Sequence, residues 1–197
     1  MATKYDLLST LRNVQSGVIS PEEALLQMKL APFEDLGYAK VDYHRAVRQG
    51  ASEVIYGQSK TPEHIAGILE AMQRRDSTNI LVTRIEQETA DWLAERFPLR
   101  YEPLAKLAVV LPRPTEQRGA IVVITGGTSD IGVAEEAAIT AETLGNRVTR
   151  LYDVGVAGLH RLLSQLEPLM KARVVVAVAG MEGALASVVG GLVDCPV

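Results

Sequence analysis

The chain has 197 residues, 47% of them hydrophobic and 22% charged, which is typical of a folded protein with one large or two small domains. Its net charge of −4 divides equally at residue 116, so neither part offers the basic stripe that binds nucleic acid or an anionic membrane. The single cysteine, Cys195, excludes an intramolecular disulfide and a zinc site built from several thiolates. Because the N-terminus has no secretory signal, and because Glu182 interrupts the longest low-charge stretch, 174–193, we expect a cytoplasmic protein without a membrane span.

The first part of the chain predicts a small α/β domain that begins with a helical hairpin. One face of the first helix carries four apolar residues, Leu7, Leu8, Leu11 and Val14. The second helix begins at 20–23, where a serine cap precedes a proline and two glutamates. The elements expected after the hairpin are strands at 40–42, 52–56, 79–83 and 106–111, and helices at 60–72 and 86–97.

A change of composition marks a domain boundary. Eleven of the sixteen glycines lie between Gly119 and Gly191, and the segment LPRPTEQRG before them combines prolines, polar residues and a final glycine. Such segments are typical of interdomain linkers. We therefore predict two domains, 1–116 and 117–197.

The second part predicts a flavodoxin-like, three-layer αβα fold with a parallel sheet. Apolar strands alternate with helices, which is typical of a parallel sheet covered on both faces. The expected elements are strands at 120–125, 147–152 and 173–179, helices at 131–144 and 160–171, a small-residue helix after Gly183, and the start of a fourth strand at 195–197. Because such sheets have about five strands, we expect a C-terminally truncated chain with an incomplete sheet.

A glycine-rich loop, TGGTSDIG at 125–132, follows the first of these strands. Its glycines and hydroxyls stand at a helix N-terminus, a combination that suits phosphate binding. Alternatively, the loop is a tight turn whose hydroxyls only cap the helix. The fingerprint of short-chain dehydrogenases is disfavoured, because Asp130 replaces a glycine near the pyrophosphate, the motif does not begin the chain, and no Tyr-x-x-x-Lys pair follows.

Two further loops follow the other strands, at the edge where such sheets bind ligands. The second loop, DVGVAGLHR at 153–161, offers two glycines for close approach of a ligand and His160 for proton exchange. Alternatively, His160 caps a helix on a solvent-facing side. The third loop, AGMEGA at 179–184, places Glu182 between glycines in an apolar context, where a carboxylate is costly unless paired or used. The alternative is a surface turn that accepts a charge.

The three loops in this order, GGTSD, DVGVAGLHR and AGMEGAL, resemble those of the LarB-type proteins of nickel-pincer cofactor biosynthesis. These proteins are relatives of the carboxyaminoimidazole ribonucleotide mutases of purine synthesis. Glu182 stands in the region where the mutases have a histidine, and the segment VDYHRAVRQGASEVIYGQSKTPEHI is similar to one typical of the LarB-type branch. The resemblance covers nearly the whole chain.

This resemblance implies a synthase that adds carbon dioxide to the pyridinium ring of nicotinic acid adenine dinucleotide and hydrolyses its phosphoanhydride, releasing AMP. It implies no tightly bound cofactor, while a divalent metal could assist the hydrolysis. It also implies a homo-oligomer, an octamer in the complete protein, and a nucleophilic cysteine C-terminal to Val197. Because Cys195 does not match that cysteine and is expected to be a small buried residue, we expect this chain to be inactive by itself.

The resemblance assigns roles to residues of all three loops. We expect Glu182 to be the general base and Asp130 and His160 to be further catalytic residues. No metal ligands are predicted. The residues expected to contact the dinucleotide are Gly126, Gly127, Thr128, Ser129, Asp153, Gly155, Val156, Ala157, Gly180, Met181 and Gly183.

Other functions stay open at this point. They are an aminoimidazole ribonucleotide carboxylase of the mutase type, a non-catalytic nucleotide-binding subunit and, less favoured, an NAD-dependent dehydrogenase. A polar cluster in the first part either binds substrate carboxylate or phosphates in a neighbouring subunit or forms surface ion pairs. Its members are Asp42, His44, Arg45, Arg48 and Lys60.

Overall fold

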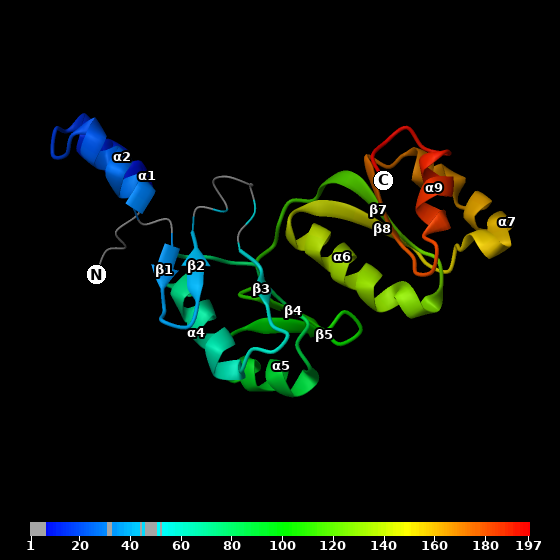
Figure 1. Ribbon diagram of the computed structural model, residues 1–197, viewed down its shortest axis with the longest axis horizontal. Helices are drawn as coiled ribbons and strands as arrows, with labels where there is room; N and C mark the ends of the chain where they lie inside the picture. Colours follow the sequence, from blue (N-terminus) through cyan, green and yellow to red (C-terminus); the bar gives the residue numbers. More distant parts are fainter. Residues whose placement is uncertain (1–6, 31–32, 44, 46–50, 52) are drawn as a thin grey trace.

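The computed structural model describes residues 7–30, 33–43, 45, 51 and 53–197 (Figure 1). Two helices at one end of the molecule precede a small mixed α/β part, and a parallel α/β part forms the opposite end. Within the described residues, no helix is both long enough and apolar enough to cross a membrane.

The chain begins with a helical hairpin, α1 (Leu7–Gln15) and α2 (Pro21–Leu30), which confirms the first predicted element. A reciprocal capping box starts α2. The Ser20 N–H donates to Glu23 Oε2 at 2.8 Å, and the Glu23 N–H donates to Ser20 Oγ at 3.1 Å. These hydrogen bonds satisfy two N–H groups at the start of the helix and hold the pKa of Glu23 below its usual value.

The hairpin is followed by two small sheets. One is the antiparallel pair of β1 (Phe33–Asp35) and β2 (Lys40–Asp42). The other has the order β3 (Ile55–Tyr56), β4 (Ile80–Thr83), β6 (Leu107–Val110) and β5 (Leu99–Glu102). In this sheet β3 and β4 are parallel, whereas β6 is antiparallel to both of its neighbours.

Two helices cover one face of the four-stranded sheet, α4 (Pro62–Gln73) and α5 (Gln87–Ala94). The helix predicted at 60–72 is confirmed as α4, and the Thr61 side chain caps it by accepting the His64 N–H at 3.3 Å. Strands β1 and β5 were not predicted. Their sequences, FED and LRYE, are short and lack an apolar run, so pairing with the neighbouring strand rather than local pattern makes them strands.

The C-terminal part is a parallel sheet in the order β8 (Asn146–Leu151), β7 (Arg118–Thr125) and β9 (Val174–Val178). Helix α6 (Ile131–Thr143) covers one face, where Ala134 and Ala138 pack on Val123. The other face packs against α7 (Leu159–Leu163), α8 (Leu166–Met170) and α9 (Ala184–Gly190). The sheet therefore lies between two helical layers, which confirms the predicted flavodoxin-like αβα architecture.

Two predictions for this part are corrected. The single helix expected at 160–171 is divided into α7 and α8, because Pro168 has no N–H for the Ser164 carbonyl and its ring would clash with that carbonyl in a continuous helix. The residues at 195–197 form no regular strand. One strand-like contact exists there, because the Val175 N–H of β9 donates to the Pro196 carbonyl at 2.9 Å.

Helix α6 also packs against the N-terminal part of the chain. Ile139 is 4% exposed and belongs to an apolar cluster with Leu81, Leu107 and other residues of the four-stranded sheet. At the start of the helix, a Cβ atom on Gly132 would lie 3.0 Å from the Leu104 carbonyl oxygen, so the β5–β6 turn contacts the first helical turn directly. Helix α6 therefore packs against both the four-stranded sheet and the parallel sheet.

A half-buried ionic cluster fixes α6 on β8. The Arg150 guanidinium lies 3.1 Å from Glu135 Oε1 and 3.0 Å from Glu142 Oε2, and both carboxylates come from α6. Tyr152 donates its hydroxyl hydrogen to Glu135. Burial and this hydrogen bond raise the pKa of Tyr152, and the Glu142 hydrogen bond raises that of Arg150, so the cluster keeps a neutral phenol and a charged guanidinium.

We predict that Ile139→Ala destabilises the protein by about 2–5 kcal/mol, because it opens a cavity between α6 and the N-terminal sheet. The measurement is urea denaturation. The control is Val133→Ala, which removes an aliphatic group from the same helix at a side chain that is 56% exposed, and which should stay within about 0.5 kcal/mol of the wild type. Equal effects of the two changes would contradict the packing described here.

Candidate functional site

The three loops predicted to carry chemistry meet at the carboxyl ends of β7, β8 and β9. They enclose a cavity of about 410 Å³, a volume within the usual range for small-molecule sites. The cavity lies at the end of the molecule that carries α7 and α9 (Figure 1). Its lining residues are Gly126, Gly127, Ser129, Asp130, Gly155, Val156, Ala157, Arg161, Ala179, Gly180, Met181, Glu182, Ala184 and Leu185.

The first loop leaves β7 and tightens into the 3₁₀ turn η1 (Thr128–Asp130) before α6 begins. The Gly126 N–H donates to the Val178 carbonyl of β9 at 3.0 Å, which holds the loop on the neighbouring strand. Asp130 Oδ2 accepts the Gly127 N–H at 3.1 Å. This carboxylate lines the cavity and also shapes the loop, because it takes up a backbone donor at the turn.

The second loop is joined to the first by backbone contacts around Thr125, which is fully buried. Its Oγ1 accepts the Asp153 N–H and its carbonyl oxygen accepts the Val154 N–H, each at 3.0 Å. A Cβ atom on Gly155 would lie 2.4 Å from the Gly126 carbonyl oxygen. Only glycine at 155 allows the two loops to touch in this way.

An arginine of the second loop reaches the cavity. Arg161 lies in α7, lines the cavity, and forms an ion pair with Asp153, with 2.6 Å between Nη1 and Oδ2. The sequence analysis did not assign Arg161 to the site, although the residue stands in the quoted motif. His160, next to it, is exposed and does not line the cavity. Helical geometry turns adjacent side chains about 100° apart, which separates the two.

The third loop carries a free carboxylate and strained backbone. Glu182 lines the cavity, is exposed, and makes no hydrogen bond or ion pair with any other residue that the structure describes. The residues on either side of Glu182 adopt left-handed conformations, Met181 with φ of 54° and Gly183 with φ of 68°. Such backbone is unusual for methionine and is found where a loop aims a neighbouring group. A catalytic role of Glu182 stays a prediction.

The structure brings together ten of the fourteen predicted site residues. Four do not line the cavity, namely Thr128, Asp153, His160 and Gly183. Four lining residues were missed, namely Arg161, Ala179, Ala184 and Leu185. Ala179 and Ala184 are the two ends of the third loop, 179–184, and Leu185 follows it directly, so assigning the whole loop and one further residue would have included all three. Within the described part of the chain, no three His, Cys, Asp or Glu side chains form a metal-binding group.

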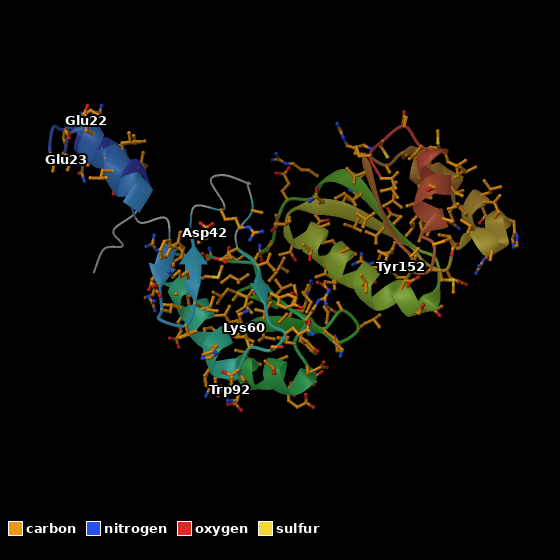
Figure 2. The ribbon with its side chains drawn as sticks, viewed as in Figure 1. Glu22, Glu23, Asp42, Lys60, Trp92 and Tyr152 are labelled. Carbon is orange, nitrogen blue, oxygen red and sulfur yellow. The ribbon has the colours of Figure 1, made fainter. Side chains whose placement is uncertain are left out.

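The polar cluster of the first part lies elsewhere. The Asp42 N–H donates to Glu53 Oε2 and Lys60 Nζ donates to the Tyr56 carbonyl, both at 2.6 Å. Figure 2 shows Asp42 and Lys60 in the N-terminal part, away from Tyr152, which precedes the second loop of the cavity. Two members of the cluster, His44 and Arg48, lie outside the part of the chain that the structure describes. The same holds for Ser52, the first residue of the strand expected at 52–56.

Comparisons with known proteins agree with this architecture. Residues 33–112 match the family model of the LarB/PurE-like N-terminal domain. A protein of Methanocaldococcus jannaschii named "Uncharacterized protein MJ0165" is 36% identical over 204 residues, an alignment that spans 98% of this chain and 78% of the relative. The chain belongs to the LarB/PurE-like family. It is therefore a LarB/PurE-type enzyme, and the match confirms the family resemblance seen in the sequence.

In this LarB/PurE-like protein, Gly155→Ala should destabilise the fold by about 1–3 kcal/mol, because the new methyl group meets a backbone oxygen that cannot move aside freely. Urea denaturation measures the change. Gly180→Ala is the matched control, since a Cβ atom at that cavity-lining position would have no neighbour within 4 Å. If Gly155→Ala proved as stable as the control, the close contact between the two loops would be wrong.

Proposed function

We propose that this protein carboxylates the pyridinium ring of nicotinic acid adenine dinucleotide and hydrolyses the phosphoanhydride, releasing AMP. The observation that carries the proposal is one cavity with two kinds of lining. One side offers groups suited to phosphate, and the other offers apolar groups beside a carboxylate that has no partner among the described residues. The family match supports a LarB/PurE-type enzyme, and the residues of the cavity favour this substrate within it.

The phosphate side is formed by the first two loops. Ser129 offers a hydroxyl at the turn that opens α6, whereas the Asp130 carboxylate at the start of this helix accepts the Gly127 N–H, so we place the phosphates at Ser129 and Arg161. Arg161 is the only cation among the described residues that line the cavity. A pyrophosphate placed here would accept hydrogen bonds from the Ser129 hydroxyl and from the guanidinium donors of Arg161 that do not contact Asp153.

The ring side is formed by the third loop and the start of α9. Ala184 and Leu185 give it an apolar wall, and Glu182 stands beside them. A flat pyridinium ring fits such a wall, and its positive charge is compatible with a nearby carboxylate. The proposed position therefore brings the ring to the one lining carboxylate that has no partner among the described residues.

The chemistry needs a base at this position. A pyridinium carbon does not attack carbon dioxide, but addition of a thiolate to the ring gives a dihydropyridine whose enamine carbon does, forming the new carbon–carbon bond. Removal of the proton from that carbon and expulsion of the thiolate then restore the aromatic ring. We assign the proton removal to Glu182. By resemblance, the thiolate belongs to a cysteine C-terminal to Val197.

Ser129→Ala should weaken binding of nicotinic acid adenine dinucleotide by about 1–2 kcal/mol, the usual loss for a hydrogen bond to a charged group. Isothermal calorimetry on this chain measures it. Thr128→Ala is the control, because Thr128 is a neighbouring exposed hydroxyl that does not line the cavity. Aminoimidazole ribonucleotide and NADH serve as competing ligands. Tight binding of either, with none of the dinucleotide, would replace the proposed function by a mutase-like or a redox one.

Glu182→Gln should leave dinucleotide binding unchanged and lower carboxylation by roughly 10²–10⁴, the typical contribution of a positioned base. Binding is measured by calorimetry. Turnover is measured by incorporation of labelled bicarbonate, in a protein that extends through the cysteine implied by the resemblance. The 197-residue chain itself should bind and not turn over. Full carboxylation by the Gln variant would make Glu182 a turn residue and assign the proton transfer to another group.

A further inference from the structure

Asp153 has a different place from the one its motif suggests. The family resemblance assigns it to substrate binding, yet it does not line the cavity. Its Oδ2 atom instead lies 2.6 Å from Nη1 of Arg161, which does line the cavity. The acidic side chain thus pairs with the cation of the site without lining the cavity itself.

The backbone holds Asp153 at a fixed point. Its N–H donates to the hydroxyl of the fully buried Thr125, and the next N–H, of Val154, donates to the Thr125 carbonyl. The residue adopts φ of 57°, a left-handed conformation that Asp and Asn tolerate better than most side chains. The carboxylate therefore projects from a position tied to the end of the central strand β7.

The guanidinium of Arg161 lies directly over the backbone of Gly158. A Cβ atom on Gly158 would lie 2.7 Å from Arg161 Nε and 3.3 Å from Nη2, so the absence of a side chain at 158 makes room for the planar group. Arg161 side-chain exposure is 39%, which leaves the group accessible to a ligand. The guanidinium therefore lies beside the Asp153 carboxylate and in the space that the glycine leaves free.

We propose that Asp153 is a positioning residue that holds Arg161 over Gly158, so that the remaining guanidinium donors face a phosphate in the cavity. A guanidinium has five N–H donors in a rigid fork, so one contact with a carboxylate orients it without using up its capacity for an anion. Fixing the group in advance also lowers the entropy that binding must remove. This proposal rests on the proposed function, which places a phosphoanhydride in the cavity.

The test is a double-mutant cycle on dinucleotide binding, measured by calorimetry. Asp153→Gly removes the carboxylate at a backbone conformation that glycine accepts, and it should weaken nicotinic acid adenine dinucleotide binding about tenfold. Asp153→Asn keeps an oxygen acceptor and should stay within about threefold of the wild type. In an Arg161→Met background, Asp153→Gly should cause no further loss. The control is Asp76→Gly, which makes the same change at a residue with the same φ of 57° after α4.

A second readout requires no ligand. Nitrogen-15 relaxation of the Arg161 Nε–Hε group should report an ordered side chain in the wild type and in Asp76→Gly, and a mobile one in Asp153→Gly. Tighter dinucleotide binding by Asp153→Gly, or additive losses in the cycle, would overturn the proposal, since Asp153 would then oppose or contact the ligand itself. An unchanged order of Arg161 would also overturn it. If the wild type binds no dinucleotide, the proposed function fails, and the relaxation data alone decide whether Asp153 holds Arg161.

Discussion

Thr125 ends the central strand with a fully buried side chain, and its two oxygens accept the N–H groups of Asp153 and Val154. This small set of hydrogen bonds joins the loop after β7 to the loop after β8. Because the loops are then close enough to touch, residue 155 must be glycine, and the first loop meets β9 through Gly126. Three segments that are far apart in sequence are therefore held at one point, and the cavity is the space that their side chains leave.

Helix α6 extends this constraint to the rest of the molecule. Its first turn opens the loop that lines the cavity, its alanine face packs on the parallel sheet, and Ile139 packs on the four-stranded sheet of the N-terminal part. The ionic cluster around Arg150 prevents the helix from rotating on β8. The N-terminal part thus contributes to the site without lining it, because it supports the helix whose start presents Ser129.

Much of the fold and the position of the site could be predicted from sequence, because apolar strands followed by glycine-rich loops carry a strong local pattern. The finer features could not. Strand β5 exists through its pairing with β6, which is a non-local property, whereas the helix break at Pro168 follows from the sequence itself, because proline lacks the N–H that a continuous helix requires. In the second loop, Arg161 lines the cavity whereas the neighbouring His160 is exposed. The sequence does not predict this difference, because the direction of each side chain depends on the residue at which α7 begins.

The close approach of Gly132 to the Leu104 carbonyl explains a glycine that sequence comparison alone would assign to ligand binding. The pattern VITGGTSDIG imitates a dinucleotide fingerprint, yet its last glycine adjoins a neighbouring polypeptide segment and does not line the cavity. This glycine is therefore needed for the packing of α6 against the β5–β6 turn. Without the β5–β6 turn a Cβ atom at 132 would meet no other neighbouring segment within 4 Å, so the requirement for glycine here comes from the N-terminal part of the chain.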